Sequence, residues 1–269
     1  MVSKEPEKDR VDKNPRARSN PFKSAIRLIF LTFVTFGLVL CYKIHGIFLR
    51  DEQRRVILAS RYTHIWGKIS TRVAGIKLEI SGQPPVKCCF LAPNHTTYAD
   101  IMILMAATRC VFISRADVEK WPVLGFGARA SGQIFLLRKK QKGMLAVSEQ
   151  ICRRLESGET VCTFLEGTTS GKGLLPFRSS FLQPAIESGA EIIPTAIKWS
   201  SINPEINLAE DVAYWKNHVF FPHAFRFFGL KGLGAKIIFG SPVSSKGRDR
   251  KRLARETEKA VKTLLENDP

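Results

Sequence analysis

Short apolar runs alternate with amphipathic stretches along the central part of the chain. Ile76, Leu78 and Ile80 alternate with polar residues, as in a strand with one buried face. Six further apolar runs typical of buried strands cover residues 88–92, 110–114, 134–137, 161–165, 192–197 and 237–239. Helical stretches are expected at residues 99–108, 118–130, 142–156 and 181–188. This alternation predicts an α/β fold with a central, largely parallel sheet flanked by helices.

The N-terminal region follows a different pattern. Residues 1–24 are polar, basic and without periodicity, which is typical of a disordered tail. Residues 28–42 then carry no charge, over a length shorter than the about 20 apolar residues of a full membrane span. We interpret this segment as a short span, a re-entrant hairpin or an interfacial helix, with a buried core helix as the alternative. Membrane anchoring is favoured because Arg16, Arg18, Lys23 and Arg27 suit anionic headgroups on the cytoplasmic side.

Two further helices are predicted outside the alternating region. In residues 47–72 apolar positions are interleaved with arginines, which indicates an amphipathic helix, either packed on the domain or lying in the membrane interface. Residues 246–269 are highly charged and predict a C-terminal helix. The chain thus divides into a tail (1–24), an anchoring segment with an amphipathic helix (25–72), one α/β domain (73–245) and a charged C-terminal helix (246–269).

The composition adds a strong positive charge. Among 269 residues, 42 Lys+Arg stand against 24 Asp+Glu, a formal charge of +18. Such a charge implies an anionic partner: nucleic acid, a membrane surface, an acidic protein or a phosphorylated substrate. The six cysteines form no C-x-x-C pair and lie at no zinc-like spacing to histidine, so we expect buried free thiols, no metal site and a reducing, cytosolic-side location.

One motif places a histidine and an aspartate in a strand-to-helix loop. Residues 94–100 read NHTTYAD and lie between an apolar strand and an apolar helix. A folded-back loop can bring His95 within hydrogen-bond reach of Asp100, which fixes the imidazole tautomer and leaves the other ring nitrogen free as a base. The alternative is a helix-capping aspartate beside an ordinary loop histidine.

Two other segments end predicted strands with residues suited to anions. Residues 164–173 (FLEGTTSGKG) form a Gly/Thr-rich loop that can present backbone N–H groups, although the spacing is not that of a P-loop. Residues 132–140 (GQIFLLRKK) end in three cations at a position where open α/β sheets bind ligands. Taken singly, an ordinary loop and a solvated charge run explain them equally well.

In this order and spacing the motifs resemble those of the glycerolipid acyltransferase family, which includes the PlsC-like 1-acyl-glycerol-3-phosphate acyltransferases. The four matching segments are Asn94-His95-x4-Asp100, Gly132-x-x-Phe135-x-x-Arg138, Phe164-Leu165-Glu166-Gly167-Thr168 and Ile192-Ile193-Pro194. The resemblance runs from about residue 87 to residue 243. It implies a single catalytic domain preceded by a membrane-anchoring helical segment.

The resemblance implies an O-acyltransferase of phospholipid biosynthesis. A fatty acyl group moves from acyl-CoA or acyl carrier protein to the free hydroxyl of a lysolipid, at the cytoplasmic face of the membrane. His95 would be the general base and Asp100 its orienting, charge-stabilising partner. Arg138, Glu166, Gly167 and Thr168 would bind the acceptor headgroup. No cofactor or metal is implied beyond the thioester co-substrate.

The third motif departs from the family pattern at two positions. Leu165 stands where Pro is common, and Thr169 stands where many lysophosphatidate-specific members have Arg. Either Lys172 or Arg178 supplies the missing phosphate ligand, or the acceptor lacks a phosphate monoester. The expected acceptor is 1-acyl-glycerol-3-phosphate, which gives phosphatidic acid; another lysolipid, such as lyso-ornithine lipid, is the alternative.

Other functions remain open on the residues alone. The same His/Asp pair could serve a thioesterase or lipid hydrolase that uses water, and a non-catalytic membrane-binding protein would also carry this charge. Nucleic acid is the least supported partner, because the basic residues cluster beside apolar segments and are not interleaved with base-stacking aromatics. The Phe-rich stretch 220–228 is interpreted as core, with an acyl channel as the alternative.

Overall fold

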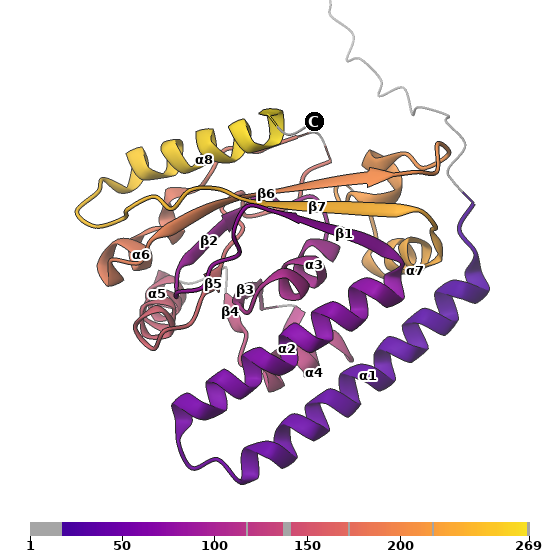
Figure 1. Cartoon of the computed structure of the whole chain (residues 1–269), viewed down its shortest axis with the longest axis horizontal. Coiled ribbons are helices and arrows are strands. Elements are labelled where there is room, and N and C mark those ends of the chain that lie inside the picture. Colours follow the sequence, from indigo (N-terminus) through magenta and orange to yellow (C-terminus); the bar gives the residue numbers. More distant parts are fainter. Residues whose placement is uncertain (1–17, 117, 137–140, 172, 217, 268–269) are drawn as a thin grey trace, which may run out of the picture.

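A seven-stranded sheet forms the centre of the computed structural model, which describes residues 18–116, 118–136, 141–171, 173–216 and 218–267 (Figure 1). The strands are β1 (Ile76–Ser81), β2 (Phe90–Pro93), β3 (Val111–Arg115), β4 (Ile134–Leu136), β5 (Val161–Cys162), β6 (Ile192–Ser201) and β7 (Leu233–Phe239), in the order β1-β7-β6-β2-β5-β3-β4. Strands β6, β2, β5, β3 and β4 run parallel, whereas β7 is antiparallel to β6 and parallel to β1. The predicted largely parallel sheet is confirmed.

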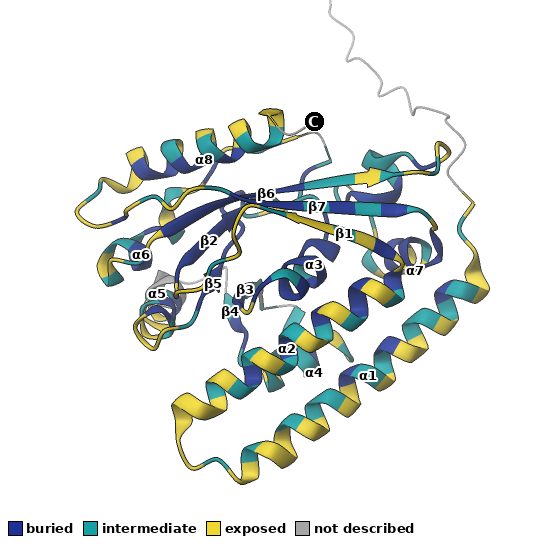
Figure 2. Ribbon diagram, in the orientation of Figure 1, coloured by how far each residue is buried: buried dark blue, intermediate teal, exposed yellow. Residues whose placement is uncertain are grey.

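Helices cover both faces of this sheet. They are α1 (Pro21–Ile47), α2 (Glu52–Ala74), α3 (Ala99–Ala107), α4 (Leu124–Ala130), α5 (Gln141–Glu156), α6 (Gln183–Ser188), α7 (Phe220–Gly229) and α8 (Arg250–Asn267). One apolar core joins the sheet to α1, α2, α3 and α7, and a second joins it to α5, α6 and α8. The buried strands between these two layers are visible in Figure 2.

The predicted elements are present, but several differ in extent; strand β6, for example, runs to Ser201 and β7 begins at Leu233. The helix expected at 118–130 is split into a 3-10 turn (Val118–Lys120) and α4, with Pro122 between them. The strand expected at 161–165 ends at Cys162, because the next residues turn into the Gly/Thr-rich loop. The Phe-rich stretch, for which we predicted no helix, is α7.

Helix α1 is longer than the uncharged segment that predicted it. The side chain of Asn20 caps its start by accepting from the backbone of Lys23, and Pro21 occupies its first turn. The helix runs without interruption for 27 residues, so a re-entrant hairpin is wrong. By length and composition alone it could cross a membrane. Residues 21–24, which we placed in the disordered tail, form its first turn, and residues 1–17 lie outside the described residues.

Both N-terminal helices are packed on the domain. Arg27 donates to the backbone oxygens of Phe228 and Leu230, at 2.7 and 3.1 Å, and Trp66 Nε1 donates to Thr35 Oγ1 at 2.9 Å. A Cβ atom on Gly67 would lie 2.5 Å from the backbone of α3, so glycine permits the close contact of α2 with α3. Of our two alternatives for the amphipathic helix, the structure shows the packed one. The predicted C-terminal helix begins at Arg250 instead of residue 246.

Candidate active site

The loop after β2 is fixed to the neighbouring strand β6. Asn94 accepts from the backbone N–H of Ile197 at 2.7 Å and donates to its carbonyl oxygen at 3.1 Å. This two-bond clamp holds the loop at the carboxyl end of the parallel strands, where open α/β sheets place their ligands. His95 follows directly on this clamp.

His95 and Asp100 are in contact, as the sequence predicted. The distance from His95 Nδ1 to Asp100 Oδ2 is 2.9 Å. The carboxylate can only accept, so Nδ1 carries the proton and Nε2 keeps its lone pair. Nε2 has no hydrogen-bond partner among the described residues, and the imidazole side chain is 15% exposed. The ring stacks on Phe164 with 3.6 Å between centroids, which fixes its plane. Such a histidine can act as a base at Nε2.

Asp100 is fully buried and accepts four hydrogen bonds. Besides His95, its Oδ2 accepts from the backbone N–H groups of Thr96 and Thr97, at 2.7 and 2.9 Å. Its Oδ1 accepts from Trp199 Nε1 at 2.8 Å. These four hydrogen bonds hold the carboxylate in one orientation. The sequence did not predict this role of Trp199, since nothing in its neighbouring sequence indicates a contact with Asp100.

Glu166 links the Gly/Thr-rich loop to the His95 loop. Its Oε1 accepts from the backbone N–H of His95 at 2.6 Å, and Oε2 accepts from that of Leu175 at 2.8 Å. The backbone of Ser170 adds a second link by donating to the His95 carbonyl oxygen. Burial raises the pKa of Glu166 to about 7, against the two backbone donors that favour its charged form. Both oxygens are occupied by the protein, so direct headgroup binding by Glu166 stays a prediction.

The other predicted binding residues lie at the mouth of the site. Gly167 has a φ of 71°, which glycine adopts readily, and Thr168 beside it is exposed. Thr169 donates its hydroxyl to the Tyr214 carbonyl oxygen. The Arg178 guanidinium lies against Gly167, where a Cβ atom would approach it to 3.0 Å. Arg138 and Lys172 lie outside the described residues.

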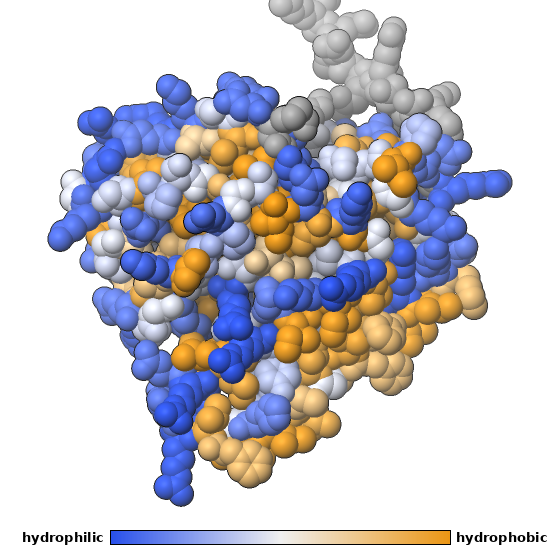
Figure 3. All heavy atoms as spheres, viewed as in Figure 1, coloured by the Kyte–Doolittle hydropathy of each residue, from blue (hydrophilic) through white to orange (hydrophobic). Residues whose placement is uncertain are grey.

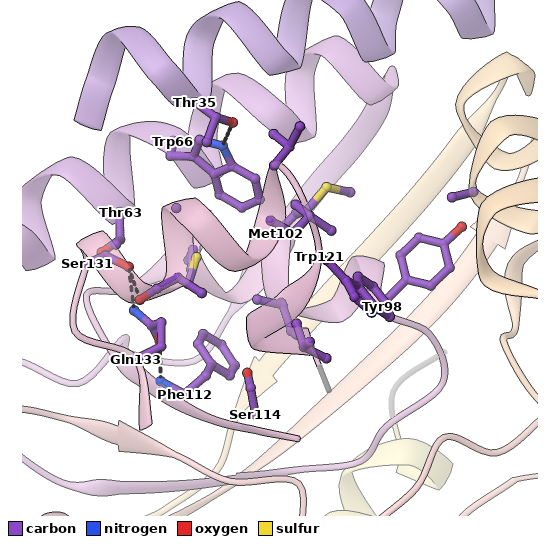
Figure 4. Close-up of a pocket in the computed structure, with 18 of the residues that line it drawn as sticks. Thr35, Thr63, Trp66, Tyr98, Met102, Phe112, Ser114, Trp121, Ser131 and Gln133 are labelled. Atoms are coloured by element: carbon purple, nitrogen blue, oxygen red, sulfur yellow. Dashed lines mark hydrogen bonds between the residues drawn. The ribbon is translucent and has the colours of Figure 1, made fainter. Parts of the chain in front are cut away.

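A large apolar cavity opens beside His95. Its volume is about 1310 Å³, larger than the roughly 300–1,000 Å³ of most small-molecule sites. Residues from α1, α2, α3, α4 and α7 line it, together with His95, Phe164, Gly167, Thr168 and Arg178. In Figure 4 the side chains of Trp66, Met102 and Phe112 project into it from three different elements. The Phe-rich α7 contributes Phe220, Phe221, Phe225 and Phe228, in line with our alternative of an acyl channel.

The thiols are free but not all buried. Cys89, Cys110 and Cys162 are buried, whereas Cys41 and Cys88 are exposed, so our expectation of burial is wrong for those two. Burial raises the pKa of Cys89 to about 12, which leaves it protonated and inert. Within the described parts of the chain, no group of three His, Cys, Asp or Glu residues could hold a metal ion.

One part of the chain matches a known family. Residues 77–198, somewhat less than half of the 269 residues, match the family model described as Acyltransferase. Strands β2 to β5, the His95 loop and the Gly/Thr-rich loop all lie within the matched segment, whereas β7 lies outside it.

Individual relatives carry two different names. A 1-acyl-sn-glycerol-3-phosphate acyltransferase of Neisseria gonorrhoeae is 31% identical over 136 residues, 49% of this chain and 53% of the relative. A lyso-ornithine lipid O-acyltransferase of Brucella abortus is 29% identical over 220 residues, 77% of this chain and 82% of the relative. The match thus spans about half of the first relative and most of the second.

A solved structure shares the fold. The 1-acyl-sn-glycerophosphate acyltransferase PlsC of Thermotoga maritima superposes with a TM-score of 0.62, covering 91% of this chain and 99% of that one, at 17% sequence identity. The coverage shows that the N-terminal helices belong to the shared architecture as well as the sheet.

Proposed function

We propose that this chain is a membrane-associated O-acyltransferase that moves a fatty acyl group from an acyl thioester to the free hydroxyl of a lysolipid. The observation that carries the proposal is the oriented His95–Asp100 pair at the mouth of a large apolar cavity. A base beside a lipid-sized apolar space is what acyl transfer between a thioester and an alcohol requires.

The pair supports direct transfer without a covalent enzyme intermediate. Nε2 of His95 removes the proton from the acceptor hydroxyl as its oxygen attacks the thioester carbonyl. Asp100 stabilises the imidazolium that forms. The tetrahedral intermediate then expels the thiolate, which takes the proton back from His95, so base and charge are restored. In this scheme Glu166 positions His95 through its backbone N–H, because both its oxygens are occupied.

The cavity favours an alcohol over water as acceptor. An acyl chain in the apolar space would exclude water from the thioester, while a lysolipid hydroxyl approaches from the mouth. Holding both reactants in one geometry supplies much of the rate acceleration. Exclusion of water from the thioester favours a transferase over the hydrolase, which the sequence alone left open.

The acceptor that we propose first is 1-acyl-glycerol-3-phosphate. Arg178 lies against Gly167 at the mouth of the site and has no ion-pair partner among the described residues. Arg178 can therefore bind the acceptor phosphate. Thr169 cannot do so, since it has no charge and its hydroxyl is bound to the Tyr214 carbonyl oxygen. Gly167 and Thr168 would complete the headgroup site.

Lyso-ornithine lipid is a second candidate acceptor. The relative with that name matches 77% of this chain, against 49% for the gonococcal glycerophosphate acyltransferase. Thr169 and a single described cation at the mouth, Arg178, also suit a carboxylate, which carries less charge than a phosphate monoester.

We further propose that α1 lies in one leaflet of the membrane, with the domain on the cytoplasmic face. Its outward residues form one apolar stripe: Phe22, Ile26, Ile29, Phe33, Phe36, Leu40, Ile44 and Ile47. This stripe is part of the apolar surface at the lower right of Figure 3. The opposite face contacts the domain along its length, from Arg27 through Thr35 to His45, which accepts from or donates to Tyr62. A helix docked in this way supports interfacial binding.

The test is a donor and acceptor panel with purified protein in lipid vesicles. We expect acylation of 1-acyl-glycerol-3-phosphate from acyl-CoA or acyl carrier protein, and its loss by at least a thousandfold in His95→Ala and Asp100→Ala. His95→Ala should keep the unfolding temperature of the parent, whereas Asp100→Ala should lower it, because Thr96, Thr97 and Trp199 lose their acceptor. Free fatty acid without acylated lipid, or full turnover in both variants, would refute the assignment.

The variant Thr169→Arg separates the two acceptors. An arginine at position 169 should raise kcat/KM for 1-acyl-glycerol-3-phosphate relative to lyso-ornithine lipid, because it adds a ligand for the phosphate. If the unmodified chain acylates only lyso-ornithine lipid, the second acceptor replaces the first.

A further inference from the structure

A second concave surface adjoins the catalytic cavity. It has a volume of about 540 Å³ and is lined by Phe177–Ser180 and by one side of α8, namely Lys251, Ala254 and Arg255. We call it the α8 groove. Arg178 and Ser180 line both the cavity and the groove, so the two spaces adjoin at these residues.

The groove is basic, and its charges are not used by the protein. The side chains of Arg178, Lys251 and Arg255 have no ion-pair or hydrogen-bond partner within the described ranges. By contrast, Arg252 and Lys262 of α8 pair with Glu256 and Glu266, at 2.9 and 3.8 Å. Three cations around one concave surface repel one another, so a bound anion would reduce this electrostatic repulsion.

The groove wall is held rigidly against the helix. The backbone N–H of Phe177 donates to Glu258 Oε2 at 2.8 Å, and that of Arg178 donates to the Leu165 carbonyl oxygen at 2.8 Å. The first bond ties the 177–180 segment to α8, and the second ties it to the Gly/Thr-rich loop. The spacing between the groove and His95 is therefore fixed by backbone contacts.

The groove lies away from the apolar stripe of α1. Helix α8 packs in the core on one face of the sheet, and α1 packs in the core on the other. Figure 1 shows α8 and α1 on opposite sides of the molecule. The charged part of a ligand in the groove would accordingly be exposed to water, while an apolar part of the same ligand could extend towards the cavity.

We infer that the α8 groove binds the phosphate-bearing head of a coenzyme A thioester. The inference rests on the proposed transferase function and adds the site of its donor. With the acyl chain in the apolar cavity and the thioester at His95, the charged head must leave on a polar side. The groove supplies Lys251, Arg255 and two serine hydroxyls there, while Arg178 at its border is left for the acceptor phosphate; Arg and Lys are the usual phosphate ligands. Its concave form suits a small molecule better than the surface of a carrier protein.

The test uses the full chain with Lys251→Glu/Arg255→Glu. The matched control is Lys259→Glu/Lys262→Glu, which makes the same charge change on α8 outside the groove. We expect the groove variant to raise the KM for acyl-CoA about tenfold or more, with kcat and the lysolipid KM unchanged. The reason is that two cation–phosphate pairs are replaced by carboxylates that repel the phosphates. The control variant should keep all three values.

A binding measurement makes the result independent of turnover. Titration with CoA should show the same loss of affinity in the groove variant, and dephospho-CoA should lose less because it carries less charge. An unchanged acyl-CoA KM and CoA affinity, or equal losses in groove and control variants, would overturn the inference. A rise in KM for acyl carrier protein alone would also overturn it and assign the surface to that protein. Absence of transfer in the unmodified chain would instead count against the proposed function, and the CoA titration would still decide the site.

Discussion

Asp100 shows how one buried carboxylate can serve both the fold and the chemistry. Its negative charge has no exposure, so the four donors around it carry the whole stabilisation that water would otherwise provide. Three of these donors come from its own loop, and the fourth is Trp199 of β6, the strand that pairs with β2. Removing the β6 donor tests whether orientation or charge balance matters more.

We expect Trp199→Phe to lower kcat/KM about tenfold, because an unpaired buried oxygen costs about 1–3 kcal/mol. With one donor fewer, Asp100 attracts the imidazolium more strongly, so the acid limb of the kcat/KM profile should move to higher pH. Trp215→Phe is the control, since its indole donates to Ala209 instead. A lower unfolding temperature with an unmoved pH profile would reduce Trp199 to a packing residue.

Glu166 gives a second residue-level prediction, on stability. Its pKa is raised from 4.5 to about 7 in the fold, so ionisation costs the folded state stability as pH rises from 4.5 to 7. Glu166→Gln does not titrate. The parent should therefore lose about 3 kcal/mol of unfolding free energy between pH 4.5 and pH 7 that the variant does not lose.

Chemical unfolding at pH 4.5 and pH 8 measures this difference. The exposed Glu149→Gln is the control and should show no comparable shift. An absolute loss in the glutamine variant is expected at both pH values, because an amide cannot accept from both backbone N–H groups. Only the change with pH bears on the prediction.

Local sequence predicted some of these contacts and not others. The His95–Asp100 contact lies within one loop and a first helical turn, so the motif indicated that it could form, and the four motifs together favoured it over a helix-capping aspartate. The Trp199–Asp100 bond depends on β6 pairing with β2, more than 90 positions away in sequence. Likewise the motif indicated Glu166, but its partner Leu175 becomes visible only once the loop has folded back.

At the scale of elements, α1 has two functions on two faces. Its inner face forms a wall of the cavity, and its outer face carries the apolar stripe. Alternating apolar runs predicted the sheet because strand burial is a local property. The cavity could not be predicted in this way, since its walls come from helices separated by more than a hundred residues.

We expect Phe33→Glu to weaken vesicle binding about tenfold or more, because a buried Phe contributes about 1.5–3 kcal/mol. Phe33 is 71% exposed on α1, so the change should leave the fold intact. Val86→Glu, at a still more exposed position outside α1 (98%), should bind like the parent. Sedimentation with vesicles reports the bound fraction, and equal binding of the two variants would contradict an interfacial α1.

At the scale of the molecule, charge and apolar surface work together. In the docking that we propose, the charge of +18 would attract the chain to anionic lipid, and the α1 stripe would then hold it there. The α8 side, on the other face of the sheet, would stay open to soluble anions.

Salt should separate the two contributions to membrane binding. Raising the ionic strength from about 0.1 M to about 1 M shortens the Debye length from about 10 Å to about 3 Å. Affinity for anionic vesicles should fall at least tenfold, towards the value for zwitterionic vesicles, which should change little. Equal salt responses for both vesicle types would mean that the net charge has no part in docking.

The shared wall between membrane surface and cavity has a practical consequence. A detergent that covers α1 meets the same helix that borders the acyl space, and its alkyl tail resembles a fatty acyl chain. Long-chain detergents should therefore act as inhibitors competitive with the acyl donor, whereas short-chain or bulky ones should not. Removing α1 to obtain a soluble version would open the acyl space to water, so the choice of amphiphile determines how much activity survives purification.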